Sequence, residues 1–188
     1  MEAADRLFTR QGFHATRLDA IAAAAGYTKG AVYSNFRSKE DLFFAVYERR
    51  AERGVADIRR VFEQTADTRA ALRRLAAEAS ARRGGERDGW LSVFYEFWAH
   101  VLRHPEHRAR FADIHARAQR PFVAALEAHV AGSGARPAVP LRQLAVAMLA
   151  MVTGLSLERL VQPDVVDAGL SELITDVTFE QLVEAGRG

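Results

Sequence analysis

The chain has 188 residues, 26 lysines and arginines against 24 acidic residues, and no cysteine. That length can bury a hydrophobic core as one domain or as two closely packed ones. The absence of cysteine excludes disulfides and thiolate metal sites, and it favours a reducing, cytoplasmic location. Because the net charge is only +2, any affinity for nucleic acid must come from a local patch of the surface. The opening MEAADRLF carries two acids and no long apolar run, so we expect no signal peptide.

Apolar residues at helical spacing predict three short helices at the start of the chain. The first covers residues 2–11 and stops at Gly12. We expect Thr16 to be the N-cap of the second, which ends at Gly26, and Thr28 to cap the third only two residues later. Two short helices joined by so tight a glycine turn form a helix-turn-helix, and the helix before them completes a three-helix unit.

The remaining sequence also has helical patterning, so the predicted fold class is all-α with about nine helices. A fourth helix, capped by Ser38, runs to about residue 64. The helices that follow are predicted at about 68–83, 90–103, 105–130, 141–161 and 170–185. We expect the glycine pair at 84–85 and Gly89 to separate the first two of these, since glycine weakens helices.

The stretch QLAVAMLAMVTGLSL, residues 143–157, contains no charge. It is shorter than the roughly 20 residues needed to span a bilayer, so we expect no membrane partner. A helix that is apolar nearly all round must be covered on both faces. A second copy of the chain is the simplest cover for one face, and the alternative is a central position in a monomeric bundle.

The exposed face of the third helix, residues 28–36, carries the predicted chemistry. Once Val32 faces the core, Lys29 and Tyr33 are stacked on an exposed strip. Lys29 stands at the start of this helix and Arg17 at the start of the preceding one, where the helix dipole disfavours a cation by about 0.3–1 kcal/mol. Two cations at the wrong end of a helix indicate a missing anion, and DNA phosphates would satisfy both.

Neighbouring residues on this surface suit different contacts with DNA. Tyr33 and Lys39 can donate to phosphate oxygens, which positions the helix without reading sequence. The candidates for contact with base edges in the major groove are Thr28, Lys29, Gly30 and Ser34. Gly30 disfavours the helix by roughly 1 kcal/mol relative to alanine, but it lets a base edge come close. For Tyr33, a half-buried place in the core is the alternative.

The pattern G-F-x-x-T followed by I-A-x-x-A-G-Y-T-K-G-A-V-Y-S-N-F-R-S-K-E-D-L resembles the DNA-binding domain of the TetR family of transcriptional regulators, in an AcrR-like form. The resemblance covers about residues 3–47. It implies a cytoplasmic homodimer with a DNA-binding domain at 1–47 and a helical ligand-binding and dimerisation domain at 48–188. The family's DNA contacts, carried over position by position, fall on Arg17, Thr28, Lys29, Gly30, Tyr33, Ser34 and Lys39.

The resemblance also implies a function: a regulator, most commonly a repressor, that a small hydrophobic effector releases from a palindromic double-stranded DNA operator. Two features depart from the family pattern. Arg17 stands where members commonly have threonine or serine, which replaces a hydroxyl contact by a charged one. The chain also begins almost inside its first helix, without the basic arm of many members, so either the arm's contacts are absent or the start is misplaced.

The effector pocket and the dimer interface are predicted on the later helices. Helix 90–103 has aromatic residues on more than one face, and apolar walls with a few polar groups suit a hydrophobic ligand. The candidate pocket residues are Phe94, Tyr95, Trp98, Val101, Phe111, His115, Phe122, Met148 and Met151. An ordinary hydrophobic core is the alternative. The resemblance places dimerisation on the last two long helices, where the candidate residues are Leu144, Met148, Val152, Leu155, Leu173 and Val177.

Three histidines have a spacing that invites a metal, because His100 and His104 lie one helical turn apart and His107 follows. No carboxylate or cysteine completes a clear set in the sequence, so we expect surface and capping roles, no metal site and no cofactor. No local motif resembles a nucleophile–base arrangement, a phosphate loop or a pair of catalytic carboxylates, so we expect no enzyme. The alternative function is a helical small-molecule or haem-type binding protein whose N-terminal unit is an interaction module without DNA affinity.

Overall fold

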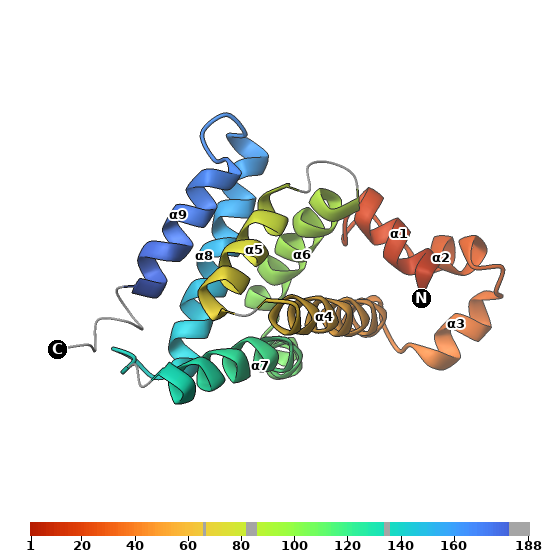
Figure 1. The fold of residues 1–188 in the computed structure, drawn as a ribbon. Coiled ribbons are helices and arrows are strands. Elements are labelled where there is room, and N and C mark those ends of the chain that lie inside the picture. The colour runs from red at the N-terminus through yellow and green to blue at the C-terminus, as the bar shows by residue number, and fades with distance from the viewer. Residues whose placement is uncertain (66, 82–85, 134–135, 181–188) are drawn as a thin grey trace. The chain divides into compact units, whose positions relative to one another are not determined.

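The structure, a computed structural model, describes residues 1–65, 67–81, 86–133 and 136–180 (Figure 1). Within these ranges the chain forms helices and connecting loops and no strand, which confirms the predicted all-α class. The elements in chain order are α1 (Glu2–Gln11), α2 (Leu18–Ala24), α3 (Lys29–Asn35), α4 (Lys39–Glu63), α5 (Thr68–Ala81), α6 (Glu86–Arg103), the 3₁₀ turn η1 (Pro105–His107), α7 (Arg108–Ser133), α8 (Leu141–Val161) and α9 (Ala168–Phe179).

The helices divide into two compact units. Unit 1 contains Met1–Arg53 and Arg83–His115, and unit 2 contains Gly54–Arg82 and Ala116–Gly188. Two of the three divisions between the units fall inside continuous helices, α4 and α7, and the third, at 82/83, lies outside the described residues. The sequence-based boundary at residue 47 stays a prediction.

Aromatic rings from three helices form the core of unit 1. Phe8 of α1, Phe13 in the following turn, Phe43 of α4 and Phe97 of α6 are all buried. The ring centroids of Phe43 and Phe97 lie 4.1 Å apart in a stacked arrangement, and those of Phe13 and Phe97 lie 4.9 Å apart edge to face. Burying one such side chain stabilises the fold by about 1.5–3 kcal/mol. The helix-turn-helix therefore shares its core with α6.

The turn after α1 is fastened to α6 by one carboxylate. The backbone N–H groups of Phe13 and His14 donate to the two carboxylate oxygens of Glu96, each at 2.8 Å. Gly12 ends α1 with φ of 83°, and a Cβ at this position would lie 2.6 Å from Oε2 of Glu96. Only glycine satisfies both the positive φ and the lack of space. The prediction that Gly12 ends the helix is confirmed.

Thr16 does not cap α2, which corrects the predicted N-cap. The N-cap residue is Arg17, whose side chain makes no capping hydrogen bond. Thr16 is buried, and its hydroxyl donates to the carbonyl oxygen of Gly12 at 2.6 Å and approaches that of Leu7 at 3.3 Å. Its hydroxyl therefore bonds to the turn that follows α1 and does not cap α2.

Gly89 lies inside α6, so the prediction that it separates two helices is wrong. α6 begins at Glu86, four residues before the predicted start. A Cβ on Gly89 would lie 2.7 Å from the carbonyl oxygen of Thr9 in α1. The glycine therefore marks a close approach of α1 and α6 rather than a helix break. The glycine pair at 84–85 lies outside the described residues.

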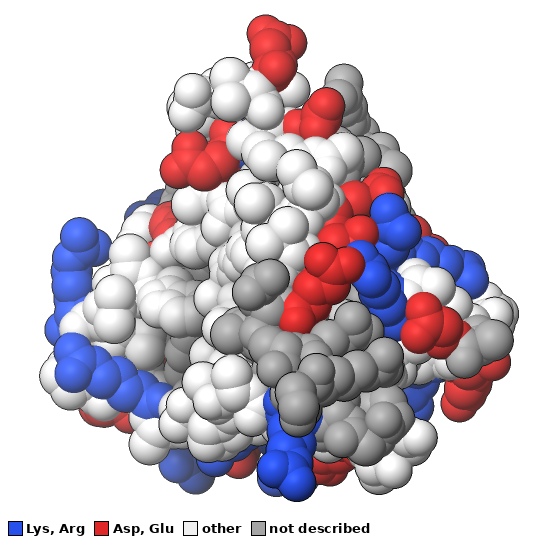
Figure 2. Space-filling model, turned by 60° about the vertical axis from the view of Figure 1, so that its left-hand side comes forward, with Lys and Arg blue, Asp and Glu red and all other residues white. Residues whose placement is uncertain are grey.

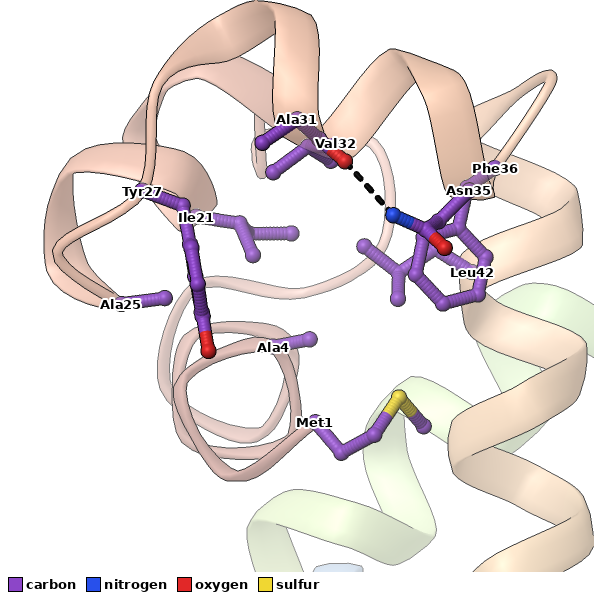
Figure 3. A pocket seen from close by; sticks show the side chains of 10 residues that line it. All are labelled: Met1, Ala4, Ile21, Ala25, Tyr27, Ala31, Val32, Asn35, Phe36 and Leu42. Atoms are coloured by element: carbon purple, nitrogen blue, oxygen red, sulfur yellow. Dashed lines mark hydrogen bonds between the residues drawn. The ribbon is translucent and has the colours of Figure 1, made fainter.

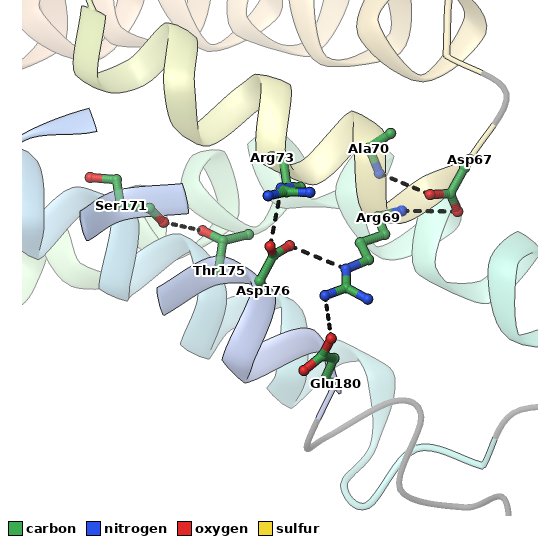
Figure 4. A network of polar contacts seen from close by, with 8 residues as sticks. All are labelled: Asp67, Arg69, Ala70, Arg73, Ser171, Thr175, Asp176 and Glu180. Atoms are coloured by element: carbon green, nitrogen blue, oxygen red, sulfur yellow. Dashed lines mark hydrogen bonds and ion pairs between the residues drawn. The ribbon is translucent and has the colours of Figure 1, made fainter. Parts of the chain in front are cut away.

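In unit 2, α5 packs against α9 and both pack against α8 (Figure 1). Asp176 of α9 pairs with two arginines of α5, at 3.3 Å from Arg69 and 3.0 Å from Arg73 (Figure 4). Arg69 also donates to Glu180. The buried residues beneath these pairs are Leu72, Phe122, Leu126, Leu144, Ala145, Met148 and Phe179. The described part of the last helix ends near residue 180, so the predicted end at 185 lies outside the described residues.

The surface of α8 is apolar on its exposed side as well as its buried side. By length and composition alone α8 would pass as a membrane span, and one such helix is weak support for a span. Leu144 and Met148 lie in the core of their own unit, so they do not belong to the exposed face where the dimer interface was predicted. In Figure 2, which turns the side carrying α9 forward, uncharged residues form a continuous strip between charged groups.

Candidate nucleic-acid interface

The packing of α3 leaves one of its faces in solvent. Val32 is buried in the core of unit 1 beside Ile21 of α2. The predicted residues at the N-cap and on the solvent side of α3 are all exposed: Thr28, Lys29, Gly30, Tyr33 and Ser34. Because 53% of Tyr33 is exposed, the alternative of a half-buried core tyrosine is wrong. Arg17 is exposed at the start of α2.

The two hydroxyl groups on α3 serve the helix and keep spare hydrogen-bonding capacity. Thr28 caps the helix as predicted, and its Oγ1 accepts from the N–H of Ala31 at 3.2 Å. Ser34 donates to the carbonyl oxygen of Ala31 at 3.0 Å. Since a hydroxyl has one donor and two acceptor sites, Thr28 can still donate and Ser34 can still accept at the exposed surface.

Lys29 has an anion within its own chain, which corrects the expectation that this surface lacks one. Its ammonium group donates to the carboxylate of Asp19 in α2. The two side chains are 67% and 45% exposed, and such solvent-exposed pairs contribute only about 0–1 kcal/mol. A phosphate or base edge can therefore displace Asp19 at little cost. For Arg17, the described part of the chain offers no ion pair.

Lys39 contacts the turn after α1 rather than standing free on the exposed face of α3. It lies half-buried at the start of α4, where its Nζ donates to the carbonyl oxygen of His14 at 3.0 Å. The same Nζ lies 4.6 Å from the centroid of the Phe13 ring. The structure therefore gathers five of the seven predicted residues on α3, places Arg17 on the neighbouring helix, and engages Lys39 internally.

A pocket of about 290 Å³ lies on the inner side of α3, among the helices of the three-helix unit and the start of α4 (Figure 3). Its lining is formed by Met1, Ala4, Ile21, Ala25, Tyr27, Ala31, Val32, Asn35, Phe36 and Leu42. The polar side chains in this lining are those of Tyr27 and Asn35. The amide of Asn35 donates to the carbonyl oxygen of Ala31 at 2.8 Å. Sequence patterning did not reveal this pocket, because its walls come from four helices.

The predicted effector residues divide between the two units. Unit 1 contains Phe94, Tyr95, Trp98, Val101, Phe111 and His115, and unit 2 contains Phe122, Met148 and Met151. In unit 1 the rings of Trp98 and His115 lie 5.2 Å apart, and the Tyr47 hydroxyl lies 2.8 Å from Nδ1 of His115. Burial lowers the pKa of His115 and raises that of Tyr47. That all nine line one pocket stays a prediction.

Unit 2 has an open pocket of about 490 Å³ that the sequence did not indicate. It lies between α4 and α7, and none of the nine predicted effector residues lines it. The lining residues are Val55, Arg59, Phe62, Glu63, Arg117, Arg120, Pro121, Ala124 and Ala125. An apolar floor with three guanidinium groups suits a molecule that has an apolar body and a negative group.

His100 is buried rather than superficial, which corrects the predicted surface role. It is 8% exposed, and its Nε2 lies 3.5 Å from a carboxylate oxygen of Glu40 in α4. Burial and the neighbouring His104 lower the pKa of His100, and Glu40 opposes this shift. His104 has a capping role, since its Nδ1 lies 2.8 Å from the carbonyl oxygen of His100. Glu40 was missed because it is remote in sequence from the histidines.

Two family models match the chain. The model described as "Bacterial regulatory proteins, tetR family" matches residues 1–46, and the model described as "BetI-type transcriptional repressor, C-terminal" matches residues 68–184, more than half of the chain. The chain belongs to the TetR family. This confirms the resemblance noted in the sequence and places the protein among transcription regulators rather than enzymes.

Two curated relatives of the TetR-family chain are similar over short segments. The HTH-type transcriptional activator FasR of Mycolicibacterium smegmatis is 38% identical over 71 residues, which are 38% of this chain and 32% of FasR. The HTH-type transcriptional regulator AcrR of Shigella flexneri is 48% identical over 48 residues, 26% of this chain and 22% of AcrR. The match therefore spans about a third of one relative and about a fifth of the other.

Solved structures of TetR-type regulators are similar over nearly the whole chain. A transcriptional regulator from Saccharomonospora viridis in complex with choline has a TM-score of 0.73 and 22% identity, covering 97% of this chain and 94% of that one. FadR from Bacillus subtilis, in complex with stearoyl-CoA, has a TM-score of 0.66 and 15% identity, covering 100% and 97%. At these identities the likeness shows the fold alone.

Proposed function

We propose that this TetR-family protein is a cytoplasmic, homodimeric transcriptional repressor that a small hydrophobic effector releases from a palindromic operator. Two copies of α3, one per subunit, enter successive major-groove faces of the operator, about one helical turn apart or more. The effector favours a state of the dimer with lower operator affinity, and its influence is bounded by its differential affinity for the two states. The exposed face of α3 is the observation that carries this proposal.

The chemistry of that face supports contact with base edges. Gly30 has no neighbour within 4 Å of a built Cβ except the capping hydroxyl of Thr28 at 4.0 Å, so a base edge can approach the backbone there. Thr28 and Ser34 keep one free hydrogen-bonding function each. Lys29 can exchange its exposed partner Asp19 for DNA.

Dimerisation is proposed on the exposed sides of α8 and α9. On α8, Val146, Ala150 and Val161 lie exposed along one side, and Gly154 between them has nothing within 4 Å of a built Cβ. On α9, Leu173 and Val177 are exposed one turn apart. Val152 and Leu155, half-buried on α8, complete the four predicted interface residues that remain. So much exposed apolar surface on two adjacent helices is typical of a protein–protein contact.

Two places are proposed for the effector: the aromatic cluster of unit 1, and the open pocket of unit 2 with its three arginines. Choline and stearoyl-CoA, bound in the two structural neighbours, are informative probes because they carry opposite charges. A thermal-shift screen of these two and of uncharged hydrophobic molecules would rank the candidates, since a ligand that binds only the folded state raises Tm. An anionic acyl chain is expected to stabilise more than choline if the arginine-lined pocket is the site.

DNA binding is tested by fluorescence anisotropy with fragments of the promoter region around the protein's own gene. We expect tight, specific binding. The logarithm of the association constant should fall linearly with the logarithm of the salt concentration. Lys29→Ala should weaken binding and reduce the salt slope by about two, one contact per subunit. Arg136→Ala, which removes the same charge from an exposed loop of unit 2, is the matched control and should change neither quantity.

Three outcomes of this experiment contradict parts of the proposal. Absence of any specific, salt-sensitive binding favours the alternative of a helical ligand-binding protein without DNA affinity. Dissociation of Lys29→Ala into monomers refutes the assignment of dimerisation to α8 and α9. Because the relative FasR is an activator, transcription in vitro from the bound promoter must also fall on addition of the protein. A rise would make it an activator.

A further inference from the structure

Three side chains of unit 1 converge where α4 begins. Glu40 comes from the first turn of α4, His100 from the last turn of α6, and His107 from η1. Each offers one ligand atom, and these three atoms all lie within 4.8 Å of one another. Two of the residues are the histidines that the sequence had set aside for want of a carboxylate, and the fold supplies that carboxylate.

The ring of His100 shows that this cluster is incomplete. Its Nε2 is buried and has no hydrogen-bond partner among the described residues. The nearest carboxylate oxygen, on Glu40, lies 3.5 Å away, so the two groups are close without forming a hydrogen bond. A buried ring nitrogen left in this way destabilises the fold unless something binds it.

The neighbouring charged groups leave the carboxylate of Glu40 available. Arg110 pairs with Asp41 rather than with Glu40. The Nζ of Lys39 is directed to the carbonyl oxygen of His14. His104 stacks on His100 with ring centroids 3.9 Å apart, which fixes the plane of the His100 ring. The carboxylate of Glu40 also accepts hydrogen bonds from its own backbone and from Ser38, and a carboxylate with about four acceptor sites keeps capacity for a cation.

We propose that Glu40, His100 and His107 form a binding site for a divalent transition-metal ion of the zinc class. Two imidazoles and one carboxylate, with a fourth position left for water, are a recurrent zinc ligand set. Metal–ligand bonds of about 2.0–2.1 Å place tetrahedral ligand atoms about 3.3 Å apart. The Glu40–His100 pair already matches this separation, and small side-chain rotations of the half-buried Glu40 and His107 close the wider distances.

The site joins the start of α4 to the α6–η1 junction. Glu40 is the second residue of α4, which directly follows the helix-turn-helix. A bound ion therefore fixes the first turn of α4 against the end of α6 and stabilises this arrangement of unit 1. Any effect of the ion on operator affinity rests on the proposed function, whereas the binding of the ion does not.

The test uses full-length protein without an affinity tag, stripped with a chelator and then titrated with Zn²⁺ by calorimetry and with Co²⁺ by absorption spectroscopy. We expect one ion per chain, the visible spectrum of four-coordinate cobalt, and a rise in Tm with zinc. His100→Gln, His107→Gln and Glu40→Gln should each weaken zinc binding by about a hundredfold or more, beyond the effect of losing an outer partner. His129→Gln in unit 2 is the matched control and should bind zinc as the wild type does.

Failure to bind one equivalent of zinc overturns the proposal, and so does equal binding by the wild type and the three ligand variants. Circular dichroism checks that each variant is folded. If His100→Gln does not fold, the variants at the half-buried residues Glu40 and His107 decide the outcome. An operator affinity that is absent with and without zinc refutes the proposed function and leaves the metal site standing, so the two failures are distinguishable.

Discussion

The carboxylate of Glu96 serves two backbone amides of the turn that ends α1. Both hydrogen bonds measure 2.8 Å. The same carboxylate lies so close to Gly12 that a Cβ at that position has no space. The turn precedes α2 by a few residues, so the position of the helix-turn-helix depends on a side chain of α6. The residue is structural, although it lies far in sequence from the helices that it holds.

Replacing Glu96 by alanine should destabilise unit 1. The amide of Phe13 loses its acceptor at a partly buried site, which costs about 1–3 kcal/mol, whereas the exposed amide of His14 can bond to water instead. We expect a lower urea midpoint by circular dichroism with an unchanged slope. Glu106→Ala, at an exposed position of η1, is the control and should stay within about 0.5 kcal/mol of the wild type. Equal midpoints for the two variants would remove the structural role of Glu96.

His115 should make stability depend on pH. Burial lowers the pKa of His115 below its ordinary value, so the unfolded chain takes up this proton more readily than the folded one. The contribution to the free energy of unfolding is therefore fully present above the ordinary pKa of about 6.5 and is lost as the pH falls. In urea titrations from about pH 7.5 to 5, the wild type should lose stability more steeply than His115→Phe.

The control for this pH dependence is His129→Gln, which should keep the wild-type slope. Burial also lowers the pKa of His100, so the stability of His115→Phe should still depend on pH to a smaller extent. Parallel curves for the wild type and His115→Phe would show that His115 is not the titrating group. The hydroxyl of Tyr47 keeps its proton throughout this range, because burial raises its pKa.

Individual side-chain partners were the least predictable part of the site. The sequence correctly placed Tyr33 and Ser34 on the exposed face of α3, because helical periodicity turns them away from Val32, and Thr28 at its exposed N-cap. It did not reveal that Asp19 pairs with Lys29, since that contact depends on the angle between α2 and α3. A helix pair's crossing geometry is a tertiary property that local patterning does not encode.

At the level of elements, the sequence predicted which segments are helices, but it did not predict where α2 and α6 begin. Capping residues and apolar periodicity located α3, α4 and α8 closely. The predicted helix break at Gly89 was wrong because a glycine can occur in a helical sequence for two reasons. It can end the helix, or it can allow a neighbouring backbone to come close. Only the position of α1, whose Thr9 carbonyl oxygen faces Gly89, decides between them.

Two glycines in helices should respond oppositely to substitution by alanine. At Gly89 the added Cβ meets a backbone carbonyl oxygen at 2.7 Å, so α1 and α6 must move apart, at a cost of about 1–3 kcal/mol. At Gly54 in α4 nothing lies within 4 Å, so alanine should stabilise the helix by up to about 1 kcal/mol. Thermal unfolding should give a lower Tm for Gly89→Ala and a higher one for Gly54→Ala. A higher Tm for both would refute the close approach.

For the whole molecule, the apolar sides of α8 and α9 predict the oligomeric state. Leu173→Glu, at a side chain that is 58% exposed, should convert the proposed dimer to monomer at micromolar concentration, because it would bury an unpaired charge in the proposed interface. Leu102→Glu is a matched control on α6, since Leu102 is 57% exposed. Analytical ultracentrifugation should find that control still dimeric. If both variants remain dimers, the interface lies elsewhere.

The shared aromatic core of unit 1 has a consequence for exchanging parts between regulators. The ring of Phe43 stacks on Trp90 and Phe97 of α6, and Arg50 lies over the Trp90 ring. A fragment ending at residue 47 would leave these aromatic faces bare. A chimera that joins this DNA-reading segment to the body of another family member must therefore also carry over the α6 surface, or recreate it. A transfer of the helix-turn-helix must therefore include α6, although α6 is remote from it in sequence.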